Sequence, residues 1–327
     1  MDSITQAALG AAIGQAVLGK KIGPKAAIIG AAVATIPDLD VLLLPFFDTL
    51  EGISVHRGYS HSIFFSVLGA ALLTFIFSKL KWTSQISIQQ LFVFNWLALF
   101  THMLLDAFTT YGTQLFLPFS DQRVSFDSVN IVDPFYTVPL IIGVFLTIYQ
   151  QLKKSKWSKA NSIGIIVSSL YLIFTLANKN LISNEVKSEL GKQQIQFNDL
   201  TTVPVGIGNF NWYGVARNKD SLFIGAYHSR EKPIHFESFP INEHLLQGID
   251  PELSEKLKWM SKNFYTVAED NGVIRVYNLQ CDMQGVRTYG NYKAPTAFYY
   301  EITPQSDGSF KLSTGMHSKT IENEEQQ

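Results

Sequence analysis

The chain has 327 residues, enough for two ordinary domains, and its formal net charge is -1 with an isoelectric point of about 6.7. A chain so close to neutral has no global basic field, which argues against a nucleic-acid partner. The single cysteine, Cys281, excludes an intramolecular disulfide and a multi-cysteine zinc site, and we expect it to be a small buried hydrophobic residue. Any bound metal must therefore be held by histidine and carboxylate side chains.

Hydrophobic residues are distributed unevenly along the chain. Residues 1–180 are mostly apolar with long uncharged stretches, whereas charged and polar residues are mixed in freely over 181–327. This asymmetry predicts a multipass α-helical membrane domain followed by a soluble, mostly antiparallel-β (α+β) domain. The first charged side chain is Asp2, whereas a secretory signal begins with basic residues, so we expect no signal peptide.

The first two apolar segments are short or interrupted. Residues 4–18 would rise only about 22 Å as a helix, which is short for a full span. Within them Gly10 and Gly14 form a small-xxx-small pair that allows close helix packing. Residues 26–47 begin as a helix, but Pro37 interrupts them. Broken helices at membrane depth are typical of ion sites.

The later apolar segments predict further spans, at residues 62–78, 88–110, 134–152 and 161–177. Lysines gather in three turns between spans, at Lys20–Lys25, Lys79–Lys81 and Lys153–Lys159. The positive-inside rule makes all three turns cytoplasmic. The loops at 45–61 and 111–133 then lie outside, and so does everything after residue 180, which makes the second domain extracytoplasmic.

The second half of the chain has the pattern of a small antiparallel sheet domain. Three pairs of apolar runs flank turns at residues 218–220, 269–272 and 306–309, which predicts three hairpins. Residues 253–263 predict an amphipathic helix, and the polar tail from Ser318 to Gln327 is expected to fray. The histidines of this half lack ligand-like spacing and are interpreted as surface residues: His228, His235, His244 and His317.

Three polar clusters lie inside or beside the apolar segments. They are Pro37-Asp38-Leu39-Asp40, His56-Arg57-Gly58-Tyr59-Ser60-His61 and Thr101-His102-Met103-Leu104-Leu105-Asp106. Ionisable side chains are costly inside a membrane, so a functional role is the default interpretation. Helix rise and the lysine topology put all three clusters in the outer third of the bilayer. We therefore expect them to converge on one metal ion.

Imidazole and carboxylate ligands suit a divalent metal, with zinc favoured and manganese or iron as alternatives. The candidate metal ligands are Asp40, His56, His61, His102 and Asp106. His102 and Asp106 share one helical face, although a structural hydrogen bond would use the same spacing. Ser60 is a candidate N-cap for a helix that begins at His61 or Ser62.

Asp38 and Arg57 are the candidate catalytic residues. One of the two aspartates at 38 and 40 could bind metal while the other orients an imidazole or takes a proton from water. The alternative for both is a helix cap or an exposed loop position. Arg57 carries a fixed positive charge suited to an anionic oxygen such as phosphate, or to anchoring at headgroup level.

The clusters resemble those of the YdjM-like family of bacterial inner-membrane proteins. The resemblance also uses the opening Met1-Asp2-Ser3-Ile4-Thr5 and the segment Thr109–Thr113, and it covers residues 1 to about 150. It implies location in the inner (cytoplasmic) membrane and metal-dependent hydrolysis. Members of the family often carry histidine where this chain has Gln6, a poorer metal ligand, so the number or affinity of bound ions is expected to differ here.

These observations support three functional hypotheses. The first is a membrane hydrolase whose outward-facing metal site activates water for attack on a lipid-like or other membrane-proximal ester or phosphoester. The second is an ion or proton carrier, which needs polar residues on both sides of the membrane midplane. The third is a membrane-anchored binding module. The lipid bilayer is the expected partner in each case, and the sequence leaves the oligomeric state open.

Overall fold

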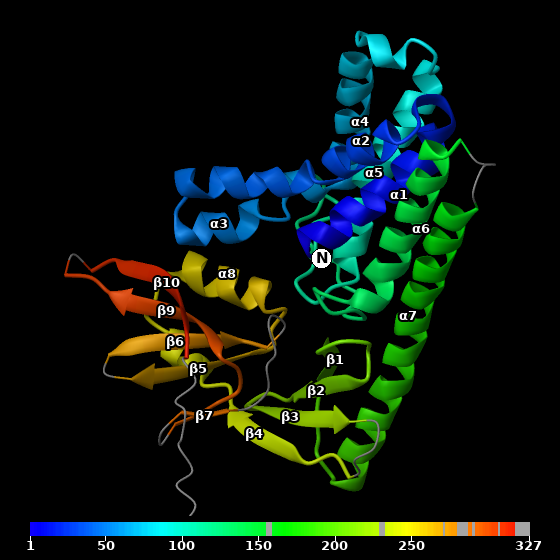
Figure 1. Cartoon of the computed structure of the whole chain (residues 1–327). Helices are drawn as coiled ribbons and strands as arrows, with labels where there is room; N and C mark the ends of the chain where they lie inside the picture. Colours follow the sequence, from blue (N-terminus) through cyan, green and yellow to red (C-terminus); the bar gives the residue numbers. More distant parts are fainter. Residues whose placement is uncertain are drawn as a thin grey trace, which may run out of the picture. The chain divides into compact units, whose positions relative to one another are not determined.

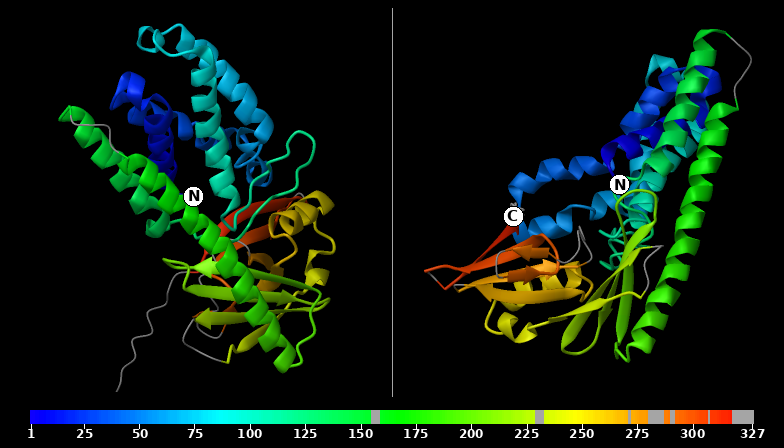
Figure 2. Two further views of the ribbon diagram at one scale, coloured as in Figure 1. Left: turned by 90° about the vertical axis from the view of Figure 1, so that its right-hand side faces the viewer. Right: turned by 60° about the horizontal axis from the view of Figure 1, so that its bottom comes forward.

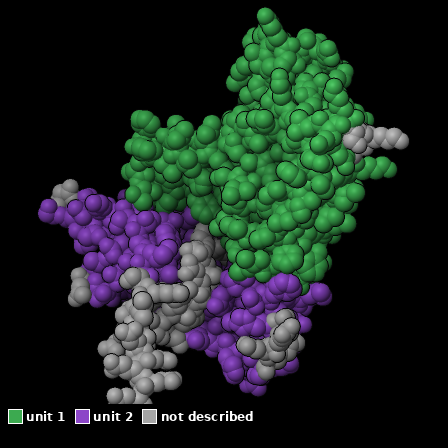
Figure 3. Space-filling view, viewed as in Figure 1, with its two compact units in different colours: residues 1–179, 206–209 green, residues 180–205, 210–327 purple. Residues whose placement is uncertain are grey.

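The structure is a computed structural model that describes residues 1–154, 159–228, 233–270, 272–279, 287–289, 292–306 and 308–317. Cys281 and the tail from Ser318 onward lie outside the described residues. The chain divides into two compact units, coloured separately in Figure 3. Unit 1 comprises Met1–Lys179 with Gly206–Asn209, and unit 2 comprises Asn180–Val205 with Phe210–Gln327.

Unit 1 is helical. Its elements are α1 (Ser3–Ile22), α2 (Lys25–Ala34), η1 (Pro37–Phe46), α3 (Thr49–Val55), η2 (Tyr59–His61), α4 (Ile63–Ser78), η3 (Lys81–Thr83), α5 (Ile88–Ala107), α6 (Pro134–Leu152) and the first part of α7 (Ala160–Lys192). By length and composition, α5, α6 and α7 could each cross a membrane. Two bent helix pairs raise the number of candidate spans to five. The described residues of unit 1 therefore form a helical domain with three to five candidate spans.

The break expected at Pro37 is present. Helix α2 ends at Ala34, and η1, a 3-10 helix, begins at Pro37 with its axis bent by 41°. The expected cap of the next span is wrong by two residues. Ser62, not Ser60, caps α4 by accepting a hydrogen bond from the Phe65 amide, because the Ser60 hydroxyl is used inside the polar cluster.

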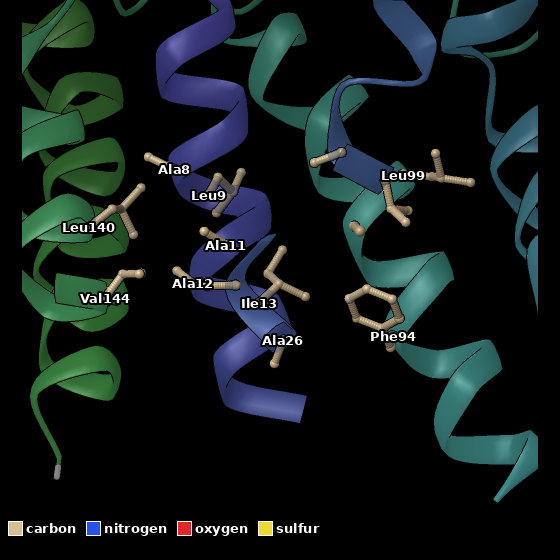
Figure 4. Close-up of a cluster of buried hydrophobic side chains, with 14 of the residues drawn as sticks. Ala8, Leu9, Ala11, Ala12, Ile13, Ala26, Phe94, Leu99, Leu140 and Val144 are labelled. Carbon is tan, nitrogen blue, oxygen red and sulfur yellow. The ribbon is translucent and has the colours of Figure 1, made fainter. Parts of the chain in front are cut away.

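Helix α1 forms the centre of unit 1, with α5 on one side and α6 on the other (Figure 4). Small residues on α1, including Ala8, Ala11 and Ala12, let these neighbours approach. Helix α2 packs most closely. A Cβ at Gly14 would collide with the carbonyl oxygen of Ala26, and one at Gly30 with that of Gly10. The small-xxx-small pair predicted from the sequence therefore lies at a contact between two helix backbones.

Helices α6 and α7 lie side by side in every view (Figures 1 and 2), tied by a hydrogen bond from the Ser168 hydroxyl to the Tyr136 carbonyl. Helix α7 continues well past the expected end at residue 177. In unit 2 its apolar stripe Ile182, Val186 and Leu190 packs on Trp212 of the first sheet. The i, i+4 spacing of that stripe keeps one face buried, which explains why the helix continues.

Unit 2 is built on two four-stranded antiparallel sheets. The first has the order β1 (Asp199–Val205), β2 (Asn211–Arg217), β3 (Ser221–His228), β4 (Phe236–Pro240). The second has the order β10 (Phe310–Met316), β9 (Phe298–Pro304), β6 (Val273–Asn278), β5 (Tyr265–Asp270). A short ladder joins β7 (Arg287–Tyr289) to β8 (Tyr292–Ala294), and the helical segments are η4 (Glu243–Leu246) and α8 (Pro251–Met260).

All three predicted hairpins are confirmed as antiparallel pairs, β2 with β3, β5 with β6, and β9 with β10. The amphipathic helix predicted over 253–263 is α8. Its buried residues Leu253, Leu257 and Met260 have helical spacing, so the pattern identified both the element and its inner face. The α+β character of the second half of the chain is thus established.

Candidate metal centre

Four side chains from three separate elements meet in unit 1. Asp38 lies in the first turn of η1, His61 ends η2, and His102 and Asp106 lie one turn apart on α5. Each supplies one ligand atom, and the four atoms lie within 4.8 Å of one another. Within the described residues this is the one such group of metal-ligating side chains. The three clusters identified in the sequence therefore do converge.

The spacing of the four atoms suits a single ion. His61 Nε2 lies 3.2 Å from His102 Nε2, 3.3 Å from Asp106 Oδ2 and 3.4 Å from Asp38 Oδ1. His102 Nε2 lies 3.3 Å from Asp38 Oδ1 and 3.8 Å from Asp106 Oδ2. Ligands at about 2.0–2.1 Å in a tetrahedron around zinc would stand about 3.4 Å apart. The donor set and its spacing therefore fit a zinc-sized divalent ion.

Burial gives a second indication. His61, His102 and Asp106 are fully buried, and Asp106 Oδ2 makes no hydrogen bond to any described residue. Arg57 Nε lies 3.2 Å from this oxygen as an ion-pair partner, but neither atom makes a hydrogen bond, and a buried carboxylate oxygen without one is costly. Two imidazole nitrogens facing each other must also share a proton or a common ion. A cation between the four atoms would remove both costs.

The ring of His61 is oriented by a short relay. The Ser60 hydroxyl donates to Asp40 Oδ2 at 2.7 Å and lies 2.9 Å from His61 Nδ1. Because Ser60 has only one hydroxyl proton, His61 Nδ1 must carry the proton between these two atoms. That tautomer leaves the lone pair of Nε2 directed at the other three donors. A carboxylate behind a metal-binding histidine commonly has this role.

Asp40 and His56 lie beside the four-atom cluster rather than in it. Asp40 Oδ1 is 3.0 Å from His56 Nδ1, and Asp40 Oδ2 also accepts the Arg57 amide at 3.1 Å. From the sequence, Asp40 and His56 are candidate ligands and Asp38 is a candidate catalytic residue. The structure instead brings Asp38 to the cluster. In a 3-10 helix of about three residues per turn, positions 38 and 40 point about 120° apart.

Arg57 faces the buried side of the cluster. Its Nε is 3.2 Å from Asp106 Oδ2, and its Nη1 donates to the Thr109 hydroxyl at 3.0 Å. The backbone of Arg57 has φ of 60°, a left-handed conformation that non-glycine residues seldom adopt, and it aims the side chain inward. Arg57 is thus neither a headgroup anchor nor exposed to an incoming ligand at this side.

Two residues near the cluster were not singled out in the sequence. The guanidinium groups of Arg57 and Arg123 both lie over the ring of Tyr111, at 4.8 and 4.5 Å from its centroid. The Tyr111 ring also approaches the His56 ring edge-on at 5.7 Å. No spacing in the sequence links these positions, because the loop 111–133 brings Arg123 back over Tyr111 through the Thr113–Val124 bridge.

Gln6 lies at the site. Its Nε2 donates to Asp106 Oδ1 at 2.9 Å and to the His102 carbonyl at 3.2 Å. The amino group of Met1 contacts the same Asp106 oxygen. Gln6 therefore holds Asp106 through the Oδ1 atom of the carboxylate and leaves Oδ2 for the cluster.

Unit 2 contains a separate pocket of about 640 Å³ beside η4 and α8. Its charged lining includes Glu243 and Lys258, which pair at 2.8 Å, and Lys258 also reaches Glu255 at 3.2 Å. The hydrogen bond from Lys258 lowers the pKa of Glu243. These charges satisfy each other. Of the unit 2 histidines interpreted as surface residues, His235 and His244 are exposed, whereas His228 and His317 are half-buried and hydrogen-bond to Asn211 and Tyr277.

Two known proteins are similar to part of this chain. The uncharacterized protein YfhP of Bacillus subtilis (strain 168) is 30% identical over 184 residues, 53% of this chain and 51% of YfhP. The inner membrane protein YbcI of Escherichia coli (strain K12) is 33% identical over 122 residues, 37% of this chain and 69% of YbcI. The match thus spans about half the length of YfhP. No solved structure matches the chain.

The family model of the YdjM inner membrane protein matches residues 1–182. That range contains all four residues of the cluster, together with Asp40, His56 and Arg57, and it makes up more than half of the chain. The apolar helices of unit 1 agree with the location given in the family's name. The chain therefore belongs to the YdjM inner membrane protein family.

Proposed function

We propose that this protein is a membrane-embedded, metal-dependent hydrolase that acts on a lipid-like or other membrane-proximal ester or phosphoester. The observation that carries the proposal is the four-donor cluster of Asp38, His61, His102 and Asp106, three of whose members are fully buried. A bound divalent metal, zinc by preference, supplies Lewis acidity and lowers the pKa of water toward 7. The remaining chemistry belongs to the protein's own side chains.

A substrate reaches the cluster from the side where Asp38 lies. Its side chain keeps 25% of its exposure, whereas the side chains of His61, His102 and Asp106 are closed off. Beside it His56 is 28% exposed, and its ring centroid is 6.2 Å from that of His61. His56 and Asp38 therefore frame the opening of the site.

We assign His56 the role of general acid and base. Asp40 Oδ1 accepts the hydrogen bond from His56 Nδ1, which fixes the ring and leaves Nε2 free to take a proton from water or give one to the leaving group. Arg57 and Gln6 hold Asp106 in place from the buried side. In this assignment Arg57 is a positioning residue rather than a group that binds substrate.

An ion or proton carrier fits less well. Away from the cluster, buried polar side chains of unit 1 tie helices together in pairs, such as Gln15 with Gln151, Asn95 with Thr74, and Asn161 with the Ala12 carbonyl. Groups engaged in this way stabilise helix packing. Such local pairs give no support to a polar path across the unit.

The metal site is tested on the full chain purified in mild detergent, by measuring bound metals with and without chelation. We expect about one divalent ion per chain at a four-ligand site. His61→Ala and His102→Ala are expected to lose it, whereas His235→Ala, an exposed histidine of unit 2, keeps it. Protein without any bound or rebinding transition metal would refute the proposal.

The reaction is tested by a screen of phospholipids, acyl esters and phosphoesters in mixed micelles. We expect hydrolysis of a membrane-proximal substrate that chelation abolishes and the same metal restores. His102→Ala is the inactive control. A protein that binds metal stoichiometrically but hydrolyses none of these classes would leave the site assigned and reject the hydrolase role.

A further inference from the structure

The exposed apolar side chains of η1 point to a surface that the metal site does not explain. Six large apolar residues in or next to η1 are exposed: Leu39, Val41, Leu42, Leu43, Phe46 and Phe47. Phe46 keeps 82% of its accessible surface and Leu42 keeps 65%. Only Pro37 and Asp40 of this helix are buried. So much exposed apolar surface on ten residues is unusual for a segment that lies in water.

Exposed side chains occur on more than one face of η1. At about three residues per turn, Leu39 and Leu42 share one face, and Leu43 and Phe46 lie on another, beyond the buried Pro37 and Asp40. Val41 lies on the third face, which also carries Leu44 toward α3. A docked protein would cover one face of such a helix. A fluid apolar medium covers every face that α3 leaves open. This distribution therefore selects lipid as the occupant rather than a second protein surface.

The returning helix has the opposite character. Together η1 and α3 form what we call the arm, residues 37–55, which carries four acidic residues and no lysine or arginine. The turn and α3 present Asp48, Thr49 and Glu51 as exposed side chains, and Leu44 packs against Gly52 between the two helices. The arm is thus amphipathic across its thickness, apolar on η1 and polar on α3.

The arm leaves the direction of the candidate spans. The axis bends by 41° between α2 and η1 and by 56° before α4. In Figure 1 the arm extends sideways from the helices of unit 1, with η1 above α3. The lysine-bearing turns, between α1 and α2 and between α4 and α5, lie at the upper end of the same unit. If that end is cytoplasmic, η1 faces the bilayer and α3 faces water outside.

The base of the arm is fastened at the metal site. Asp40, in the first turn of η1, bonds His56 and the Arg57 amide at the far end of α3, and also Ser60. Asp38, the partly exposed member of the cluster, lies in the same turn of η1. The cluster therefore opens where the apolar arm begins.

We propose that the arm lies in the outer membrane–water interface, with η1 among the acyl chains, and that it sets the metal cluster at headgroup depth. Resting on the proposed function, this predicts substrates with their reacting bond at the headgroup and acyl chains that lie along η1. The position of the arm itself does not depend on any enzymatic activity.

The test is simple to build because the chain has only one native cysteine, Cys281, to replace. In a Cys281→Ser background, one cysteine is introduced at residue 42, 46, 51 or 170 and labelled with a nitroxide. The full-length protein is reconstituted in vesicles of phosphatidylethanolamine and phosphatidylglycerol. Power-saturation EPR then measures collisions with oxygen, which dissolves in hydrocarbon, and with a water-soluble nickel chelate. Bound metal is measured for each protein, which confirms that the base of the arm has folded.

Labels replacing Leu42 and Phe46 are expected to collide with oxygen far more than with nickel. Their ratio of oxygen to nickel collisions should approach that of the label at Leu170, an exposed apolar position of α7. The label replacing Glu51 on α3 should collide with nickel. Nickel access at positions 42 and 46 equal to that at 51 would overturn the proposal, because the arm would lie in water. Shielding from both reagents would also overturn it, in favour of a protein cover. Either result leaves metal binding and hydrolysis unaffected.

Discussion

At the scale of single residues, the site depends on two aspartates that have different partners. Asp38 approaches His61 and His102 at their Nε2 atoms, while Asp40 reaches His56, the Arg57 amide and the Ser60 hydroxyl. The relay through Ser60 then fixes the tautomer of His61. One aspartate acts on the cluster directly, and the other acts by holding an imidazole in place.

This division of roles predicts that two isosteric substitutions weaken metal binding to different extents. Asp38→Asn removes a ligand charge, so bound metal is expected to be lost on dialysis. Asp40→Asn keeps all four donors but weakens the orientation of His61, which costs about 10–100-fold in metal affinity. Competition with a chelating dye measures both affinities. If Asp40→Asn loses metal more completely than Asp38→Asn, the ligand role belongs to Asp40.

At the scale of elements, the backbone contact between α1 and α2 is the tightest constraint on unit 1. Gly10 and Gly14 on α1 face Gly30 and Ala26 on α2. A side chain added at any of the three glycines would collide with the backbone of the other helix. Because α1 also carries Gln6 to Asp106, a shift of α1 is transmitted to the metal site.

Gly14→Ala is therefore expected to destabilise the protein by about 1–3 kcal/mol, the usual cost of overpacking a close contact. The matched control is Gly191→Ala, in the last turn of α7, where a new Cβ would meet nothing within 4 Å. That change should be neutral, or stabilising by up to about 1 kcal/mol. Thermal unfolding of the full chain in detergent measures both. Equal midpoints for the two variants would contradict the contact.

The arm offers a second prediction at this scale, one that separates substrate delivery from chemistry. The double change Leu42→Ser with Phe46→Ser removes apolar surface without touching the cluster. We expect a higher KM for long-chain substrates in vesicles and unchanged kcat for a short-chain soluble analogue, with metal content unchanged. The control is Thr49→Ser on α3. A loss of kcat on the soluble analogue would show instead that the arm shapes the site.

At the scale of the whole molecule, local sequence patterns predicted most elements but not their contacts. Lysine turns, apolar runs and Pro37 located the helices of unit 1, and turn residues located three hairpins of unit 2. A division of roles between Asp38 and Asp40 was among the predictions, but which of them joins the cluster could not be chosen, since a 3-10 helix after Pro37 reads like an α-helix in sequence. Likewise, Ser60 and Ser62 are equivalent as caps until Asp40 engages one of them.

The sequence predicted that the polar clusters meet at one metal site, but not how their side chains are arranged there. Helical spacing linked His102 with Asp106, and the cost of ionisable groups in a membrane linked both to His56 and His61. By contrast, Tyr111 and Arg123 reach the site through a loop whose path no periodicity encodes. Long-range contacts of this kind depend on the whole fold.

The orientation of the whole molecule in the membrane is the remaining prediction. The positive-inside rule places Lys79 in the cytoplasm and the unit that carries Lys219 outside, and both side chains are exposed. In a Cys281→Ser background, Lys219→Cys should react with a membrane-impermeant maleimide on intact spheroplasts. Lys79→Cys should react only after the membrane is permeabilised, because its turn faces the cytoplasm. The reverse pattern would put unit 2 in the cytoplasm and turn the metal cluster toward the inner leaflet, where its substrates would have to come from cytoplasmic lipids.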